Sequence, residues 1–589
     1  MKKFLYSFLG TVAGIWISVF IGFILMFFAI GLIVSSAGSN VTTVKLQDDS
    51  VLKISLSGNI VDRETPVNLM EQIYSNAEKA VALTDMVDAI SAAKDDSQIK
   101  GIYLECAGAN MGLAQAEALI KALKEFRQSG KWVYSYADSY TQSDYYVASV
   151  ADSVFINPIG MLDIHGLSAT TIFFKGLMDK LGVEAQVVKV GTYKSAVEPF
   201  LLSGMSDASR EQQEHFLGNI WGYVKDQIAA NRNIPADSIN ALADSFTFTR
   251  RAEFYLSKGL VDGLKYNHQI TDLLASVTGK ADEPNLVSFS DYVGLSNSPL
   301  GKRAGKGKKI AVLYAIGDIV DSGNEGISAT SMVPEILKIA KDESIAGLIL
   351  RVNSGGGSAF ASEQIWEAFE QFKKLCPEKP FYVSMGDMAA SGGYYISCGA
   401  NKIYAEPVTL TGSIGIFGII PNIQPLMREK LGVNVETVQT NTGSFPTLLQ
   451  PMTDGQKAAM QSYVNNGYEL FVSRCANGRH RTVAQIKAVA EGRVWDGQSA
   501  LKHGLVDKLG GLEMAVADMA EEIGADEYYT VNYPEVKVKW WEMLLDMDSD
   551  LSAAISETDA ATIQQTARAL RTIRNMSPLQ CRTNYIRVR

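Results

Sequence analysis

Residues 386–395 have the sequence Gly-Asp-Met-Ala-Ala-Ser-Gly-Gly-Tyr-Tyr, and the fold can be worked out from this stretch. The apolar run before it, residues 381–385, is typical of a buried strand, and residues 394–400 favour a short helix. Ser391 is therefore predicted at a strand-to-helix turn, where a nucleophilic hydroxyl can project among small neighbours. The N–H of Gly392 would lie at the helix N-terminus and could stabilise an oxyanion. Serine and glycine are also ordinary turn residues, so this stretch alone leaves both interpretations open.

Segments around this turn recur about 250 positions earlier in the chain, in the same order. The matching pairs are 51–60 with 310–320, 99–104 with 345–350, 114–126 with 361–372, 131–135 with 379–384, 145–148 with 394–397, and 181–183 with 431–433. A nearly constant offset over this many segments predicts a tandem duplication. Each copy alternates apolar strands with amphipathic helices, which indicates an α/β domain with a parallel sheet and right-handed crossovers.

The duplication divides the chain into five predicted parts. They are an N-terminal anchor (1–45), a first α/β repeat (46–280), a Gly- and Lys-rich linker (281–309), a second α/β repeat (310–530), and a tail (531–589). Each repeat contains a long helical arm, at 206–232 and at 453–478. The basic cluster of the linker could contact anionic lipid, but a solvated linker is the favoured interpretation. The sequence indicates no role for the tail.

An uncharged segment follows Lys2 and Lys3 and continues to Lys45. Residues 8–34 are almost wholly apolar, which gives about 27 residues where a bilayer span needs about 20. The apolar region of a cleavable signal peptide has only about 7–15 residues, so we predict a retained transmembrane helix rather than an over-long cleaved signal. The positive-inside rule keeps the two lysines in the cytoplasm. In a bacterium, the body of the chain would then lie on the periplasmic side of the inner membrane.

Composition excludes several classes of function. The 589 residues carry a formal net charge of −10 and no concentrated basic face, which argues against nucleic acid as a partner. The five cysteines lack paired spacing, so neither a disulfide framework nor a cysteine metal cluster is predicted. The five histidines are isolated and form no H-E-x-x-H array. We therefore expect no metal site and no cofactor.

The two copies diverge at the positions where chemistry would take place. Aligning the tyrosine pairs puts Ser391 opposite Gln142, so the first copy has no nucleophile at its equivalent turn. Aligning the Leu-Gly-Val triplets puts Lys194 opposite Ser444, so the second copy lacks that lysine. Each copy has kept one possible member of a catalytic pair. This complementary loss predicts one composite site at a boundary between copies, within one chain or between chains.

A serine hydroxyl is a weak nucleophile and needs an adjacent base. No histidine lies near Ser391 in the sequence. A lysine can serve if its amine is neutral, which requires a pKa well below the ordinary value of about 10.4. Burial among apolar groups can lower the pKa in this way. Lys194 lies in a stretch with no other charge between Lys189 and Glu198, although a solvated surface lysine is the usual alternative.

A glycine-rich loop is predicted to complete the site. The apolar strand at residues 348–352 leads into Asn-Ser-Gly-Gly-Gly-Ser at 353–358, whose glycines allow backbone N–H groups to point inward. The equivalent loop of the first copy, residues 107–112, has lost the glycine run. A plain tight turn or a phosphate loop is the alternative. The G-x-x-x-x-G-K-[ST] and G-x-G-x-x-G patterns are absent from this loop, so nucleotide binding is disfavoured.

Three motifs together carry a family resemblance: Gly-Thr-Tyr-Lys-Ser-Ala-Val-Glu-Pro-Phe at 191–200, Ala-Ala-Ser-Gly-Gly-Tyr at 389–394, and Thr-Gly-Ser-Ile-Gly at 411–415. Over about residues 45–530, and in its anchor, the chain resembles the signal peptide peptidase A family, in the long double-copy form of bacterial protease IV. The resemblance implies a serine endopeptidase of the inner membrane with a Ser/Lys dyad, which degrades cleaved signal peptides. It also implies tandem domains similar to the proteolytic subunit of Clp protease and to crotonases.

The resemblance also implies roles for individual residues. The nucleophile would be Ser391, the general base Lys194, the oxyanion hole Gly356 or Gly357 with Gly392, and the residue that orients the lysine amine Ser413. No cofactor is implied. The implied partners are peptide substrates and the lipid bilayer.

We further expect a ring-shaped homo-oligomer, a tetramer by the resemblance, whose chamber encloses the sites and excludes folded proteins. The helical arms motivate this expectation, because they offer apolar faces. Two other functions compete with the peptidase: a crotonase-like acyl-CoA enzyme and a non-enzymatic membrane scaffold. A crotonase would share the oxyanion glycines but would need no serine at position 391, so the paired divergence at Ser391 and Lys194 favours the peptidase.

Overall fold

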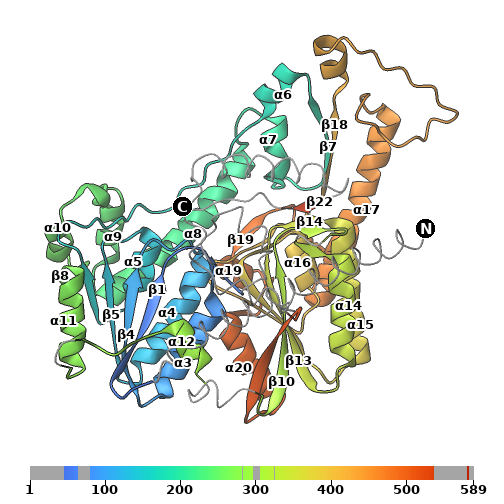
Figure 1. The fold of residues 1–589 in the computed structure, drawn as a ribbon. Helices are drawn as coiled ribbons and strands as arrows, with labels where there is room; N and C mark the ends of the chain where they lie inside the picture. The colour runs from blue at the N-terminus through green and yellow to red at the C-terminus, as the bar shows by residue number, and fades with distance from the viewer. Residues whose placement is uncertain are drawn as a thin grey trace, which may run out of the picture.

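Two α/β units with the same order of elements make up the body of the protein, seen in blue to green and in yellow to red in Figure 1. The computed structural model describes residues 46–63, 80–280, 283–295, 305–323, 326–535 and 580–582. The predicted transmembrane helix at residues 8–34 lies outside this range. Among the described helices, none combines the length and the apolar character that crossing a membrane requires.

The first unit is built on a six-stranded sheet in which every strand pair is parallel. From edge to edge, the strands are β8 (Gly263–Leu264), β6 (Ser153–Ile156), β5 (Trp132–Ala137), β4 (Ile99–Cys106), β1 (Ser50–Leu56) and β9 (Leu286–Ser288). Most residues of the central strands β5, β4 and β1 are buried, on both faces of the sheet. Such burial is typical of parallel strands that have helices on both faces.

The second unit repeats this arrangement. Its strands are β20 (Lys508–Leu509), β16 (Lys402–Ala405), β15 (Phe381–Ala390), β13 (Ile345–Ser354), β10 (Lys308–Ile316) and β21 (Tyr528–Tyr533), which pair in the same order and also in parallel. The shared strand order confirms the predicted duplication. Two further strands, β17 (Leu410–Gly412) and β19 (Val494–Asp496), extend the sheet beyond the end of β15.

Equivalent helices cover the two sheets. The pairs are α3 (Leu83–Asp95) with α14 (Ala329–Lys341), α4 (Leu113–Arg127) with α15 (Ala359–Leu375), α5 (Gln142–Ala148) with α16 (Gly392–Ser397), α8 (Asp207–Arg232) with α17 (Asp454–Gly478), and α11 (Asn267–Val277) with α20 (Leu512–Glu522). The helical arms predicted at 206–232 and 453–478 are confirmed as α8 and α17.

The apolar faces of the two arms are used inside the chain. Helix α8 buries Phe216, Ile220, Val224 and Ile228, which recur every four residues along one face and join the core of the first unit. The core of the second unit takes up the apolar face of α17 in the same way. The expectation that these faces are free for assembly is therefore wrong, because intrachain packing already removes them from water.

Part of the predicted linker is also folded. Strand β9 pairs with β1, and helix α12 (Phe289–Gly294) follows it directly. Tyr292 of α12 is fully buried, and its hydroxyl lies 3.0 Å from Asp96 Oδ2. Residues 286–294 therefore belong to the first unit rather than to the linker. The Gly/Lys-rich composition that follows obscured this short strand and helix.

A third sheet connects the two units. Its order is β12 (Ile327–Ser328), β11 (Ile319–Val320), β14 (Gly356–Ser358), β22 (Gln580–Arg582), β18 (Phe417–Asn422) and β7 (Glu184–Lys189). The first unit contributes only β7, which pairs antiparallel with β18 of the second unit. These two strands project from the body beside α6 (Lys175–Leu181) (Figure 1). Through this pairing, a strand of the first unit becomes part of a sheet of the second unit.

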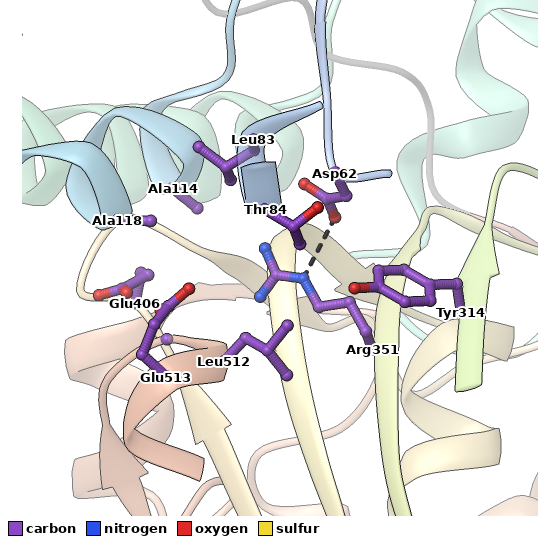
Figure 2. A pocket seen from close by; sticks show the side chains of 11 residues that line it. Asp62, Leu83, Thr84, Ala114, Ala118, Tyr314, Arg351, Glu406, Leu512 and Glu513 are labelled. Atoms are coloured by element: carbon purple, nitrogen blue, oxygen red, sulfur yellow. Dashed lines mark hydrogen bonds and ion pairs between the residues drawn. The ribbon is translucent and has the colours of Figure 1, made fainter. Parts of the chain in front are cut away.

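Buried charges also join the two units (Figure 2). Arg351 of β13 is 4% exposed and its Nε lies 3.1 Å from Asp62 Oδ2 of the first unit, which is also almost fully buried. The Arg351 Nη1 donates to Ser384 Oγ and to the Met385 carbonyl, both at 3.0 Å. A cavity of about 10 Å³ beside this pair has room for about one water molecule. Because an unpaired buried charge is strongly destabilising, the pair favours this one arrangement of the units.

Helix α4 of the first unit contacts the second unit near its start and again near its middle. Near its start, the Ala114 N–H donates to Asp387 Oδ1 at 2.8 Å. Asp387 lies four residues before Ser391 in the chain. Farther along, Lys121 forms an ion pair with the buried Glu406. Burial raises the pKa of Glu406, and Lys121 opposes that rise. The first copy therefore supports the strand that leads into the predicted nucleophile.

Candidate active site

Ser391 stands between β15 and α16, as the sequence predicts. Its backbone has φ 57° and ψ −115°, a conformation that residues other than glycine rarely adopt and that costs about 1–3 kcal/mol. Two backbone hydrogen bonds hold the turn: Ser391 N–H donates to the Gly412 carbonyl, and Tyr395 N–H donates to the Ser391 carbonyl, both at 2.8 Å. The residue is fully buried. Backbone strain held in this way is a feature that clusters at functional sites.

The glycine-rich loop at the end of β13 packs directly against this turn. A Cβ on Gly393 would lie 2.7 Å from the Ser354 carbonyl oxygen, so only glycine lets α16 approach the loop. Gly357 has a φ of 157°, and a Cβ there would lie 2.0 Å from the Ile319 carbonyl oxygen of β11. The Gly356 N–H donates to Ser354 Oγ at 3.1 Å. The approach of Gly393 to Ser354 brings the glycine-rich loop beside the turn that contains Ser391.

Lys194 reaches the same place from the first unit. After β7, Val190 N–H donates to the Ile416 carbonyl at 3.0 Å, which extends the pairing with the second unit. Lys194 itself is 1% exposed. Its Nζ lies 2.8 Å from Ser391 Oγ, 3.0 Å from Ser413 Oγ and 3.1 Å from the Ser413 carbonyl oxygen. Within a single chain, the structure therefore brings together the three side chains that the sequence selected from distant segments.

Two glycines that the sequence pattern did not indicate, Gly492 and Gly415, make room for the aliphatic part of the Lys194 side chain. A Cβ on Gly492 would lie 2.7 Å from Lys194 Cβ, and one on Gly415 would lie 3.3 Å from Lys194 Cδ. Gly492 also has a φ of 77°, which favours glycine. Gly415 belongs to a motif of the family resemblance, but no local signal connects Gly492 with a lysine about 300 positions earlier in the chain.

A glutamine on α8 fixes the backbone next to Lys194. The Gln212 Nε2 donates to the Tyr193 carbonyl at 3.0 Å and to Ser195 Oγ at 3.1 Å. Its Oε1 accepts the Val494 N–H at 3.2 Å. Gln212 is buried and thus bridges the lysine segment and the start of β19. The long helix of the first unit therefore positions the lysine that the second unit surrounds.

At the equivalent turn of the first copy, the side chains form hydrogen bonds with the backbone of neighbouring loops. The Gln142 Nε2 donates to the Gly166 carbonyl at 2.8 Å, and its Oε1 accepts the Gly166 N–H at 2.9 Å. The Asp144 carboxylate accepts the N–H groups of Gly108 and Ala109 at 3.0 and 3.3 Å. Those N–H groups belong to the loop that corresponds to the glycine-rich loop of the second copy. The Asp144 carboxylate therefore binds N–H groups at the start of this loop.

The buried carboxyl group of Asp144 is expected to make the free energy of unfolding depend on pH. Burial raises the pKa of its carboxyl group, and the hydrogen bonds from Thr141, Gly108 and Ala109 oppose the rise. The folded chain therefore holds this proton more tightly than the unfolded chain, whose aspartate pKa is about 3.9. The resulting stabilisation is complete below that value and is lost as pH rises through the folded-state pKa, at about 1.4 kcal/mol for each unit of difference.

The Asp144→Asn substitution removes this ionisation. The melting temperature of the variant relative to wild type is expected to rise between about pH 4 and about pH 8, as scanning calorimetry can measure. The exposed Asp226→Asn substitution on α8 is the matched control and should show a nearly constant difference from wild type. A constant difference for Asp144→Asn as well would contradict the assigned ionisation.

Comparisons with known proteins agree with this arrangement. The family model "Peptidase family S49" matches residues 125–279 and 373–526, one match in each copy. "Protease 4" of Haemophilus influenzae is 35% identical over 574 residues, which cover 94% of this chain and 91% of that protein. "Protease 4" of Salmonella typhi is 35% identical over 536 residues, which cover 87% and 84%. "Serine protease SPPA, chloroplastic" of Arabidopsis thaliana is 28% identical over 485 residues, which cover 80% and 69%.

Among solved structures, a mutant of ClpP1 from Listeria monocytogenes matches 35% of this chain and 94% of its own chain, at 13% identity and a TM-score of 0.24. The family match covers both copies, and the relatives named above extend over most of their own length. The chain therefore belongs to peptidase family S49 and is a serine peptidase.

Proposed function

We propose that the chain cleaves peptides with Ser391 as the nucleophile and Lys194 as the general base. The single observation that carries the proposal is the 2.8 Å separation of Lys194 Nζ from Ser391 Oγ in a buried site. Burial disfavours a charged amine. A neutral amine has two N–H donors and one lone pair, so Lys194 can accept from the Ser391 hydroxyl and donate to the two oxygens of Ser413.

In the proposed reaction, Ser391 Oγ attacks the scissile carbonyl carbon while its proton passes to Lys194 Nζ. The two Ser413 oxygens then stabilise the ammonium, which returns the proton to the leaving amine. Water then attacks the acyl-enzyme and gives its proton to Lys194 Nζ. The lysine passes the proton to Ser391 Oγ as the ester bond breaks. The oxyanion would accept the Gly392 N–H and a second N–H from the glycine-rich loop. Gly357 is the favoured second donor, because the Gly356 N–H already donates to Ser354 Oγ.

The proposed substrates are extended apolar peptides, in particular the remnants of cleaved signal peptides. One feature supports an extended substrate: glycines dominate the loop beside Ser391. Without side chains there, a peptide backbone can approach the loop closely, largely independent of its sequence. The family resemblance, rather than the geometry, suggests signal peptides as the natural source.

Hydrolysis of a quenched fluorescent signal-peptide sequence in detergent tests the proposed function. We expect cleavage into products with free amino and carboxyl termini, and no turnover of acyl-CoA thioesters by the same preparation. Turnover of acyl-CoA that persists after Ser391→Ala, without peptide cleavage, would instead support the crotonase-like alternative, which needs no serine at position 391. The absence of both activities would favour the scaffold.

The proposed location is the periplasmic face of a bacterial inner membrane, with residues 8–34 as a single transmembrane anchor. The support is the uncharged N-terminal sequence after Lys2 and Lys3. Protease added to spheroplasts should digest the body of the chain. Digestion only after the membrane is permeabilised would show the opposite orientation.

The proposed assembly is a homo-oligomer, a tetramer by resemblance, that encloses the sites. Large apolar side chains are exposed before β7 and after β18, on the part that projects from the body (Figure 1). They are Ile172, Leu177, Leu181, Leu431, Val433, Val438, Phe445 and Leu448. Exposed apolar groups in this number are typical of an interaction surface. Light scattering of the detergent-solubilised protein should therefore give an oligomer, and a fully active monomer would contradict the proposal.

A further inference from the structure

The short segment of chain that leads into β19 contacts both halves of the candidate active site. The N–H of Tyr193, the residue before Lys194, donates to the Glu491 carbonyl at 3.0 Å. The Ser413 N–H donates to the Arg493 carbonyl at 2.6 Å. This segment therefore joins the lysine-bearing loop of the first unit to the Ser413 turn of the second unit.

The backbone at this junction is strained. Glu491 has a φ of 56° and Ser413 a φ of 50°, in the left-handed region that residues other than glycine rarely adopt. Strain of this kind costs about 1–3 kcal/mol at each residue and persists only where the surrounding contacts enforce it. The junction therefore depends on the contacts that hold it closed.

The side chain of Arg493 supplies contacts of this kind. Its guanidinium carbon lies 4.6 Å from the centre of the Tyr193 ring and 4.5 Å from the centre of the Trp495 ring. Both distances are within the range of about 6 Å for cation–π attraction, which strengthens as the groups lose water. Its Nη2 lies 2.7 Å from Glu211 Oε1 of α8, and the arginine side chain is 17% exposed. One side chain of the second unit therefore contacts both the loop before Lys194 and helix α8 of the first unit.

We infer that Arg493 is a positioning residue for Lys194. Its contact with the Tyr193 ring and its backbone hydrogen bond with Ser413 hold the two segments together. The Lys194 amine then stays within hydrogen-bond distance of Ser391. The inference rests on the proposed function, since it takes Lys194 as the base.

This role should affect proton transfer rather than substrate binding. A displacement of about 1 Å at a reacting group can lower the rate about 10²-fold. The glycine-rich loop, where the peptide backbone is proposed to bind, is held by other contacts: Gly357 pairs with Ile319 of β11, and Gly393 packs against Ser354. Loss of the Arg493 contact is therefore expected to lower kcat and to leave KM nearly unchanged.

Arg493→Met tests the inference, because methionine fills similar space without a charge. We expect kcat for the quenched peptide to fall about 10²-fold and KM to stay within about twofold of wild type. Arg493→Lys keeps a cation over the rings and should restore kcat to within about tenfold of wild type. Tyr193→Leu removes the ring instead of the cation and should lower kcat by the same factor, which keeps the test decisive if Arg493→Met does not fold. A kcat within about threefold of wild type in the folded variants, or a rise in KM that accounts for the loss, would overturn the inference.

Arg474→Met is the matched control. The guanidinium carbon of Arg474 lies 3.8 Å from the centre of the Trp366 ring, and its Nη2 lies 2.6 Å from Glu363 Oε1. The substitution thus removes the same two kinds of contact, but neither involves the Lys194 loop. We expect a similar loss of thermal stability with the wild-type kcat. An equal loss of kcat in Arg474→Met and Arg493→Met would show a general effect of destabilisation and would overturn the inference.

Acetylation of Lys194 separates this inference from the proposed function, because the readout needs no catalysis. Limited treatment with N-hydroxysuccinimidyl acetate, followed by peptide mapping, measures how well this 1% exposed lysine is shielded. We expect Lys194 to react at least about tenfold faster in Arg493→Met than in wild type, since opening of the loop exposes its amine, and at the wild-type rate in Arg474→Met. Equal rates in wild type and Arg493→Met would overturn the inference even if the wild type cleaves peptides. A wild type without peptidase activity would contradict the proposed function, whereas the acetylation rates would still decide whether Arg493 positions Lys194.

Discussion

Replacing Lys194 by arginine is expected to lower kcat/KM for peptide hydrolysis by about 10²- to 10⁴-fold, the range that a positioned general base contributes. A guanidinium stays protonated at any pH at which the protein is folded, so it cannot accept the Ser391 proton. Initial rates with the quenched peptide measure the effect.

The controls for this prediction separate chemistry from folding. Lys194→Ala should lose activity to a similar degree, since it also removes the base. Lys180→Arg changes an exposed lysine on α6 and should leave the rate unchanged. Far-ultraviolet circular dichroism should show the same secondary structure in all variants. An Lys194→Arg enzyme with activity within about tenfold of wild type would show that another group accepts the proton.

Replacing Ser391 by alanine has the largest expected effect, a loss of about 10⁴- to 10⁶-fold in kcat, because loss of the nucleophile removes the covalent route altogether. The substitution removes only one oxygen atom, so the turn between β15 and α16 should stay intact. Its melting temperature should therefore remain close to that of wild type. Full progress curves with the quenched peptide, corrected for trace wild-type enzyme, measure the residual rate.

Ser444→Ala is the matched control for the serine substitution. Ser444 aligns with Lys194 between the copies, but it is exposed and its hydroxyl lies 3.0 Å from Gln439 Oε1, away from the site. Wild-type activity is expected for this variant. Substantial hydrolysis by Ser391→Ala would show that a different residue attacks the substrate.

Much of the site could be predicted because its signals are local. An apolar run, a serine and two glycines are enough to place Ser391 between a strand and a helix. The complementary losses at Gln142 and Ser444 then predict that the pair forms across the copies. In the structure, Lys194 and Ser391 lie together in one chain, although the sequence could not decide between one chain and two.

Other features could not be predicted because they depend on contacts between distant segments. The space that Gly492 leaves for Lys194 exists only once three loops have come together. The third sheet is made of short strands whose pairing has no periodic signal of its own, and β22 within it lies far from its neighbours in the sequence. Strand β9 is only three residues long and follows a polar stretch, so its place in the first sheet was missed.

The arms show how a correct local prediction can lead to a wrong inference about assembly. The amphipathic pattern of α8 is real, but the pattern does not say which surface covers the apolar face. In the structure the first unit itself covers it. Several exposed apolar side chains lie around the projecting strands, in segments without a regular period.

The activation of Ser391 by Lys194 can be measured as the rate at which a fluorophosphonate forms a covalent adduct with the protein, followed by intact mass and located by peptide mapping. The reagent reports on an activated serine and needs no knowledge of the natural substrate. We expect a single adduct on Ser391 in wild type, and a rate at least about 10²-fold lower in Lys194→Arg. An adduct on another serine, or equal labelling rates in the two proteins, would contradict the assignment of Ser391 and Lys194 as a catalytic pair.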